Sequence, residues 1–410
     1  MVPPTFSEKM RIGMRLPIDS SPSLRELPAG RSLVLTAMAT LLAAADWLPE
    51  NPYVDPDHLE FLLTVALGAL AIALALRDRL DAAATARWRN RALLAFFTIA
   101  VSLAIAEPAT RWVFRDVTTS SDNGGYFTRR WFQSGVVHEN SSGFREREFN
   151  AVKPAGTYRI VVVGDSFTWG NGVRQQDRYS DLLQARLPQH IEVLNFGASG
   201  ANTPEHRTMV EHLLGTVNPD FVLLQWYVND VEDDDSVHRP TFHSLMPIRG
   251  LHNWLNDVSA LYTVANMQWA HTQVALGMTR SYETYLKDRL GDPNSHDSQI
   301  DRAELLDLIA RCRRAGVPLG IVLFPDTAVA LGEQYPFGYL HERVLDICRA
   351  QDLTCIDLRS DFALVKDHRL LWANRLDHHP SALANEIAAE RMLETYSKQW
   401  AAPPPGNAAH

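Results

Sequence analysis

The sequence predicts an α/β protein: a three-layer, doubly wound parallel sheet that follows an N-terminal region of transmembrane helices. After Tyr158, short β-branched runs alternate with helical stretches, which is typical of a parallel sheet with helices on both faces. Before about Phe114, three apolar runs alternate with polar links, as in membrane-spanning segments. A chain of 410 residues has room for both regions.

The elements of the predicted sheet follow one another in order. The predicted strands are 158–163, 192–196, 221–226, 318–324 and 354–358. The predicted helices are 176–187, 204–217, 299–315, 337–351 and, after a final loop, 381–399. Pro204 at a helix start and Gly316 just after a helix end fit the usual start and stop residues. We therefore expect the α/β domain to span residues 158–399, with a disordered tail at 400–410.

One long interruption breaks the alternation at about residues 231–297. It opens with an acidic run and continues through an apolar stretch that contains Trp254 and Trp269. We expect a helical insertion here, either a surface element or a lid over a site, since long insertions are often functional. The acidic run Asp230–Asp235 could bind Ca²⁺, but it lacks an EF-hand pattern, so a solvated loop is the preferred interpretation.

The three apolar runs are 33–48, 59–76 and 92–106, and we expect three transmembrane helices within residues 32–114. Residues 1–31 and the link 77–91 each contain five basic residues, whereas the link 49–58 contains none. The positive-inside rule then places residues 1–31 and 77–91 in the cytoplasm and everything after about Phe114 outside it. A cleaved signal peptide or buried helices of a soluble domain are the alternatives. Residues 115–157 would be a lead-in linker.

Composition narrows the possible partners and cofactors. The formal net charge of −9 and the lack of a basic stripe give no reason to expect nucleic-acid binding. Three cysteines without a CxxC pair argue against a zinc ribbon or a thioredoxin-type site. We expect small core residues, although a Cys348–Cys355 bridge is possible if the domain lies outside the cytoplasm. We predict no metal and no cofactor.

Reactive side chains follow the strands at the positions where doubly wound sheets bind ligands. Gly164-Asp165-Ser166 comes directly after the first strand, and Gly200 lies in the loop after the second. Asn229 and Asp230 follow the third strand, and Asp377-His378-His379 precedes the last helix. The loop after Gly164 does not match a phosphate-binding GxxxxGK[ST] motif, and no G-x-S-x-G elbow is present, which leaves Ser199 as only a weak alternative nucleophile.

With these four blocks in order, the sequence resembles the SGNH/GDSL hydrolase superfamily. A further stretch, residues 140–145, is similar to the lead-in of membrane-attached bacterial members. The resemblance implies a flavodoxin-like doubly wound sheet over roughly the last 240–270 residues.

The resemblance assigns roles to individual residues. Ser166 would be the nucleophile, His379 its base and Asp377 the acid that orients the imidazole. The oxyanion hole would consist of the backbone N–H groups of Ser166 and Gly200 and the side chain of Asn229. The usual last block is D-x-x-H, but Leu376 stands at that acid position. In an extended segment residues two apart point to the same side, so Asp377 can still reach His379, and His378 would be a neighbour.

The sequence thus predicts a serine-dependent esterase or deacylase, anchored in the inner membrane by several helices, with its catalytic domain on the periplasmic side. Its substrate would be an acyl ester, with an acylated glycan as one candidate. An O-acyltransferase that modifies an envelope or exported glycan is the first alternative. A non-catalytic binding domain on the same fold is the second, because fold does not determine function.

Overall fold

The computed structural model describes residues 82–119, 124–231 and 240–401. The predicted membrane runs 33–48 and 59–76 lie outside the described residues, as do residues 1–31. The third run lies within helix α3 (Ala82–Val113). Its stretch Asn90–Val113 is long and apolar enough to cross a membrane, by length and composition, and only 6% of its apolar window is buried in protein. It is the one such helix in the described part of the chain.

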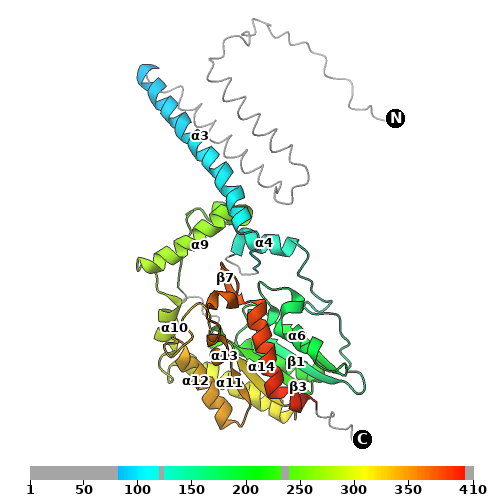
Figure 1. Cartoon of the computed structure of the whole chain (residues 1–410). Coiled ribbons are helices and arrows are strands. Elements are labelled where there is room, and N and C mark those ends of the chain that lie inside the picture. The colour runs from blue at the N-terminus through cyan, green and yellow to red at the C-terminus, as the bar shows by residue number, and fades with distance from the viewer. Residues whose placement is uncertain (1–81, 120–123, 232–239, 402–410) are drawn as a thin grey trace, which may run out of the picture. The chain divides into compact units, whose positions relative to one another are not determined.

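The sheet matches the predicted fold class. Its five strands run in parallel in the order β2-β1-β3-β4-β5, which is the flavodoxin-like form of the doubly wound sheet (Figure 1). The strands are β1 (Tyr158–Gly164), β2 (Ile191–Gly197), β3 (Phe221–Trp226), β4 (Leu319–Leu323) and β5 (Cys355–Asp357). Almost every residue of the central strands is buried, because helices cover both faces of a parallel sheet.

Helices of the α/β body connect and cover these strands. They are α5 (Ser166–Trp169), α6 (Tyr179–Arg186), α7 (Thr203–Thr216), α11 (His296–Arg314), α12 (Gly338–Ala350), α13 (Arg359–Ala363) and α14 (Ala382–Trp400). The connection from β1 to β2 runs along the sheet in the direction opposite to that from β2 to β3. Right-handed crossovers therefore place α6 and α7 on opposite faces. Helix α14 packs beside α6, and α11 packs beside α7.

A second group of helices lies at the end of α3. It comprises α4 (Gly125–Gln133), α8 (Arg249–Val258) and α9 (Ala260–Ala275), which pack together, and α10 (Tyr282–Leu290) leads back to the body. The predicted insertion is thus helical over residues 249–290. Helix α4 lies within the stretch that we expected to be a linker. It is fixed there because Tyr126, Phe127 and Trp131 are buried.

Two further expectations are corrected near the C-terminus. The predicted loop before the last helix contains a hairpin of β6 (Trp372–Asn374) and β7 (Asp377–Pro380). Trp400, which we placed in the disordered tail, ends α14 and is fully buried against Phe221. The sulfur atoms of Cys348 and Cys355 are bonded to each other, and this disulfide links α12 to β5.

Candidate active site

The candidate site lies where β1 and β3 end, at the point where the strand order reverses. The chain leaves β1 toward one face of the sheet and leaves β3 toward the other face, which opens a crevice at the carboxyl ends of these two neighbouring strands. Ser166 follows β1 and is the first residue of α5. A glycine is needed just before it, because a Cβ on Gly164 would lie 2.1 Å from the Thr168 hydroxyl oxygen. The turn from β1 into α5 therefore holds Ser166 at the top of the sheet.

Ser166, His379 and Asp377 meet in this crevice. The Ser166 Oγ lies 2.8 Å from the His379 Nε2. The His379 Nδ1 is hydrogen-bonded to the Asp377 Oδ1, which also accepts from the His379 backbone N–H at 3.1 Å. With Nδ1–H donating to the carboxylate, Nε2 is left to accept the serine proton. In this geometry an imidazole can accept the proton of a serine hydroxyl while a carboxylate orients its ring.

The hairpin explains how an acid only two residues before the histidine can reach it. Asp377 and His379 lie on β7, and alternate residues of a strand point to the same side. His378 points to the opposite side, where its ring lies 4.2 Å from that of Trp372, measured between centroids. His378 is therefore a neighbour of the pair, in keeping with the sequence-based expectation.

The pKa values of the pair shift in opposite directions. Burial alone would lower the pKa of His379, but the Asp377 carboxylate and, more weakly, Asp165 raise it above its ordinary value. Burial likewise pushes the pKa of Asp377 upward. The charge of His379, together with hydrogen bonds from His379 and Thr119, outweighs burial and lowers it below its usual range. The charged carboxylate and the protonated imidazole thus stabilise each other.

Two residues that the sequence analysis did not single out for this site contact the pair. Thr119, which follows α3, is buried and hydrogen-bonds to the Asp377 carboxylate. Asn171, in the loop after α5, places its Nδ2 3.2 Å from the His379 Nε2. Neither residue belongs to a recognisable motif, and Thr119 lies in the stretch that we expected to be a linker. Only the spatial arrangement reveals them.

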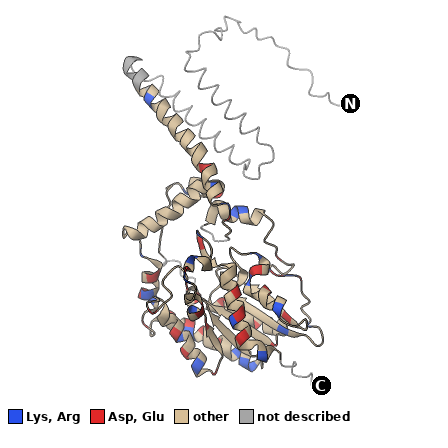
Figure 2. Ribbon diagram, in the orientation of Figure 1, with Lys and Arg blue, Asp and Glu red and all other residues tan. Residues whose placement is uncertain are grey.

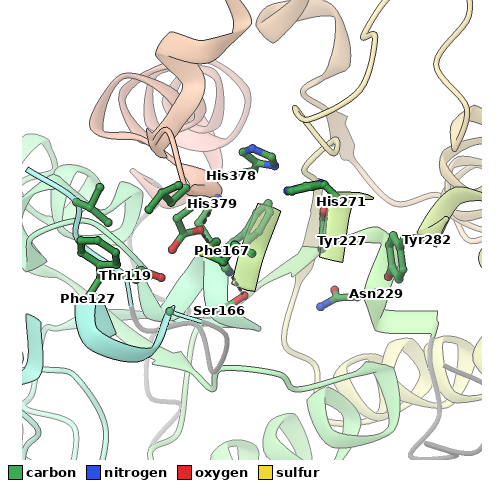
Figure 3. A pocket seen from close by; sticks show the side chains of 15 residues that line it. Thr119, Phe127, Ser166, Phe167, Tyr227, Asn229, His271, Tyr282, His378 and His379 are labelled. Atoms are coloured by element: carbon green, nitrogen blue, oxygen red, sulfur yellow. Dashed lines mark hydrogen bonds and ion pairs between the residues drawn. The ribbon is translucent and has the colours of Figure 1, made fainter. Parts of the chain in front are cut away.

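Ser166 opens into a cavity of about 410 Å³, within the size range of small-molecule sites. Figure 3 shows Ser166 and His379 in its centre, with Thr119 and Phe127 on one side and Tyr227, Asn229 and Tyr282 on the other. Its walls come from the body, from the stretch after α3, and from α9. The lining residues are Val117, Thr119, Gly124, Phe127, Ser166, Phe167, Tyr227, Asn229, Met267, His271, Tyr282, Leu376, Asp377, His378 and His379.

Asn229 lines the same cavity and contacts the acid next to Ser166. Asp165 is fully buried and accepts a hydrogen bond from the Phe167 N–H at 2.8 Å. Burial raises its pKa to about 6, although the hydrogen bond from the Phe167 N–H, the charge of His379 and the nearby amide side chains of Gln225 and Asn229 act to lower it. A carboxylate behind the Asn229 side chain limits the orientations that this amide can adopt beside Ser166.

The other predicted residues lie apart from this cavity. Gly200 has a φ of +82°, and with Ser199 it lines a neighbouring cavity of about 240 Å³ that shares no lining residue with the first. Asp230 is buried below the site and accepts from the Tyr227 N–H at 3.0 Å. Burial and the charge of Asp165 raise its pKa well above the usual range. Gly200 as an oxyanion donor thus stays a prediction.

Comparison with known families agrees with the site. The model of the GDSL-like lipase/acylhydrolase family matches residues 162–387, a stretch that contains Ser166, Asn229, Asp377 and His379. No curated protein sequence matches the chain significantly.

The chain is also similar to several solved structures. A member of the lipolytic protein G-D-S-L family from Veillonella parvula is 14% identical, and the match covers 59% of this chain and 100% of that chain with a TM-score of 0.37. The psychrotrophic esterase EstA from Pseudoalteromonas sp. is 15% identical over 59% of this chain and 97% of its own, with a TM-score of 0.36. The acetyl xylan esterase AlAXEase is 16% identical over 58% and 98%, with a TM-score of 0.37. Since the family model matches more than half of the chain, the protein belongs to the GDSL-like lipase/acylhydrolase family.

Proposed function

We propose that the protein is a serine-dependent ester hydrolase with Ser166 as nucleophile, His379 as base and Asp377 as orienting acid. The observation that carries this proposal is the 2.8 Å approach of the Ser166 Oγ to the His379 Nε2, beside a cavity of about 410 Å³. A serine hydroxyl is a weak nucleophile unless a neighbouring base accepts its proton. The role of His379 as that base is supported by its hydrogen bond to the buried Asp377 carboxylate, which orients the ring toward Ser166.

The reaction has two halves. Ser166 Oγ attacks the carbonyl carbon of the ester while its proton passes to the His379 Nε2. The tetrahedral intermediate collapses, the alcohol leaves with that proton, and the acyl group remains on Ser166. A water molecule then gives a proton to His379 and attacks the acyl-enzyme, which releases the carboxylic acid and restores the Ser166 hydroxyl. Asp377 stabilises the imidazolium that forms in each half.

The negative oxygen of the intermediate needs hydrogen-bond donors that are already in position. We assign this role to the backbone N–H of Ser166, the side chain of Asn229 and the backbone N–H of Gly200. Ser166 is in the first turn of α5, where N–H groups lack partners within the helix. The position of Asn229 on the wall of the Ser166 cavity supports its assignment. The assignment of Gly200 rests on the family resemblance.

The proposal includes a membrane anchor and an outward-facing domain. Helix α3 would cross the inner membrane through Asn90–Val113, as one of several spans, and residues after it would lie in the periplasm. Trp88 and Trp112 near the two ends of this stretch are exposed, which suits residues at membrane interfaces. The Cys348–Cys355 disulfide supports the outward location, because disulfides persist in oxidising compartments and are rare in the cytoplasm.

The acyl group on Ser166 can pass to water or to another hydroxyl. Hydrolysis is the function that we propose, with an acyl ester, including an acylated glycan, as substrate. Transfer to an envelope or exported glycan is the alternative that an outward-facing, membrane-anchored domain would also suit. Supplying one acyl donor with and without a glycan acceptor separates them: hydrolysis yields free acid in both cases, and a transferase yields acylated glycan.

A serine-directed fluorophosphonate tests the proposal. Wild-type protein should be labelled covalently, and Ser166→Ala should not be labelled. Ser199→Ala is the matched control, since Ser199 is an exposed serine of the neighbouring cavity, and it should be labelled like the wild type. Equal labelling of Ser166→Ala and the wild type would refute the assignment of the nucleophile. No labelling of any variant would favour a non-catalytic binding domain.

A further inference from the structure

The helices next to α3 differ from the α/β body in charge. Residues 240–279, called here the apolar segment, contain two charged side chains, Arg249 and Asp257, whereas residues 282–316 contain thirteen. Figure 2 shows the contrast: the ribbon of α9 is tan, while helices of the body carry red and blue residues. A surface this poor in charge can enter a less polar environment at low cost, because few charges have to leave water.

Large apolar side chains of this segment are exposed. Ile248, just before α8, is 65% exposed, and Leu276, just after α9, is 66% exposed. The exposed apolar residues of the segment are Phe242, Leu245, Ile248, Leu251, Trp254, Leu276 and Met278. Soluble proteins rarely expose many such residues close together, and where they do the patch is often an interaction site.

Hydrogen bonds hold these residues on one structural unit. The His243 N–H donates to the Gln273 Oε1 at 2.8 Å, and the Gln273 Nε2 donates to the His243 carbonyl at 2.8 Å. The Leu245 N–H donates to the Asn266 Oδ1 at 3.0 Å. The stretch before α8 therefore lies along α9. Its exposed apolar side chains are thereby spread along the length of α9, with Phe242 near the C-terminal end of that helix and Ile248 near its N-terminal half, where the Met246 N–H donates to the Tyr262 hydroxyl at 3.2 Å.

The first turn of α9 is bound to the end of α3. Glu107 of α3 accepts from the Ser259 hydroxyl at 2.8 Å and from the N–H groups of Ala260 and Leu261 at 2.9 and 3.0 Å. Arg111 pairs with Glu107 at 2.8 Å and donates to the Val258 carbonyl at 2.9 Å. At a rise of 1.5 Å per residue, Glu107 is only about 9 Å from the end of α3 at Val113.

The position of Glu107 along α3 determines where α9 would lie relative to a bilayer that α3 crosses. The apolar stretch that begins at Asn90 would be about 36 Å long at 1.5 Å per residue, slightly more than the core of a bilayer. The last turns of α3, with Glu107 and Arg111, would then be at the bilayer surface. Figure 1 shows α9 leading away from this end of α3 at a steep angle rather than along it. A helix in this position runs over the membrane surface.

We propose that the apolar segment docks on the surface of the lipid bilayer that α3 crosses. Its exposed apolar side chains enter the headgroup region, as in interfacial helices. The partner is the lipid itself, and the contact holds α9 over the Ser166 cavity through Met267 and His271, which line it. This inference rests on the proposed membrane anchor and not on the chemistry at Ser166.

Site-directed spin labelling of the full-length protein in phospholipid nanodiscs tests the proposal. Single cysteines are introduced as Ile248→Cys and Leu276→Cys. Background labelling is low because Cys312 is buried and Cys348 and Cys355 are joined in a disulfide. Accessibility to oxygen, which concentrates in lipid, is compared with accessibility to a water-soluble nickel chelate. Ile99→Cys on α3 is the reference for lipid, and Val152→Cys, 77% exposed before β1 at the opposite end of the strands from Ser166, is the reference for water.

We expect the ratio of oxygen to nickel accessibility at positions 248 and 276 to shift from the Val152→Cys value toward the Ile99→Cys value. Ratios equal to that of Val152→Cys, with Ile99→Cys in lipid, overturn the docking and leave the anchor intact. A water-like ratio at Ile99→Cys overturns both. Labels shielded from both reagents indicate a protein partner or a second copy of the chain and also overturn the proposal. No outcome depends on esterase activity, so failure of the proposed chemistry remains distinguishable.

Discussion

The α/β body and the helices around the end of α3 contribute differently to the Ser166 cavity. The body supplies Ser166, Asn229, His379 and Asp377, the groups suited to acyl transfer. The helices around the end of α3 and the chain that follows α3 supply the opposite wall, with Thr119 and Phe127 from the chain after α3 and Met267 and His271 from α9. The body thus carries the groups of the proposed reaction, whereas the helices around the end of α3 and the chain that follows α3 cover these groups and contribute the hydrogen bond of Thr119 to Asp377.

The largest effect on kcat is expected from substitution of Asp377, the carboxylate of the α/β body that is bonded to His379. Asp377→Asn should lower kcat by about 10⁴, because the amide favours the wrong tautomer of His379 and no longer stabilises the imidazolium. Steady-state kinetics on a short p-nitrophenyl ester measures this. Asp367→Asn is the matched control, since Asp367 is half-exposed and pairs with Arg369 on the surface. A kcat for Asp377→Asn near that of the control would contradict the role of Asp377.

The next largest effect is expected on the stability of the helices around the end of α3. Glu107→Gln leaves Arg111 buried without its charged partner, which typically costs about 3–5 kcal/mol. Hydrogen exchange of the first amides of α9 should accelerate strongly, while exchange in β1 and β3 stays unchanged. Glu304→Gln, which breaks a part-exposed pair with Arg207 in the body, should change little. Equal acceleration in β1 would mean that the two regions unfold as one unit.

Substitution of Asn229 tests its proposed role as a hydrogen-bond donor in the oxyanion hole. Asn229→Ala should lower kcat by about 10²–10³, because one donor to the transition state is lost, with a smaller change in KM. Asn150→Ala is the matched control, since Asn150 is exposed before β1, accepts a hydrogen bond from the Val152 N–H and does not line the pocket. A loss confined to KM would show that Asn229 binds the substrate instead of stabilising the intermediate.

Thr119, in the chain that follows α3, contacts the acid of the body, and its substitution should have a smaller effect. Thr119→Val removes a hydrogen bond to a charged carboxylate, worth about 1.5–3 kcal/mol, so kcat should fall roughly 10- to 100-fold. Thr119→Ser keeps the hydroxyl and should restore most of the activity. If Thr119→Ser is as impaired as Thr119→Val, the methyl packing of Thr119 matters and its hydrogen bond to Asp377 does not.

The pH dependence of kcat/KM tests the assignment of His379 as the base and can be measured on the fully active wild-type protein. His379 must be neutral to accept the serine proton, so kcat/KM should fall as the pH drops through its pKa. Because Asp377 and Asp165 raise that pKa, the acid limb should lie above the ordinary histidine value of 6.5. In Asp377→Asn the residual activity should show this limb at lower pH, since the stabilising charge is gone. An unchanged limb would point to another titrating group.

Most of the body could be predicted from the sequence because its elements carry strong local patterns. Buried parallel strands are continuous apolar runs, so the predicted strand 221–226 coincides with β3, and 158–163 differs from β1 by one residue. Ser166 and Asn229 follow such strands, and the topology of the sheet brings the ends of β1 and β3 side by side. The order of the motifs was therefore enough to predict one half of the cavity.

The contacts that hold Asp377 and His379 in place leave no periodic signal in the sequence. The sequence separates Thr119 from Asp377, and Asn171 from His379, by more than 200 residues, so neither contact could be read locally. The hairpin that carries Asp377 and His379 has two very short strands, too short for an alternating pattern. Helix α4 is stabilised by tertiary packing on α8 and α9, which a local pattern does not encode.

Trapping the acyl-enzyme tests the central assignment most directly. The wild-type protein is mixed with a short-chain p-nitrophenyl ester, quenched in acid within the first turnover, digested and analysed by mass spectrometry. The account predicts a mass increase equal to the acyl group on the peptide that contains Ser166, and none in Ser166→Ala. An acyl group found instead on the peptide that contains Ser199, or turnover without any acylated serine, would contradict it.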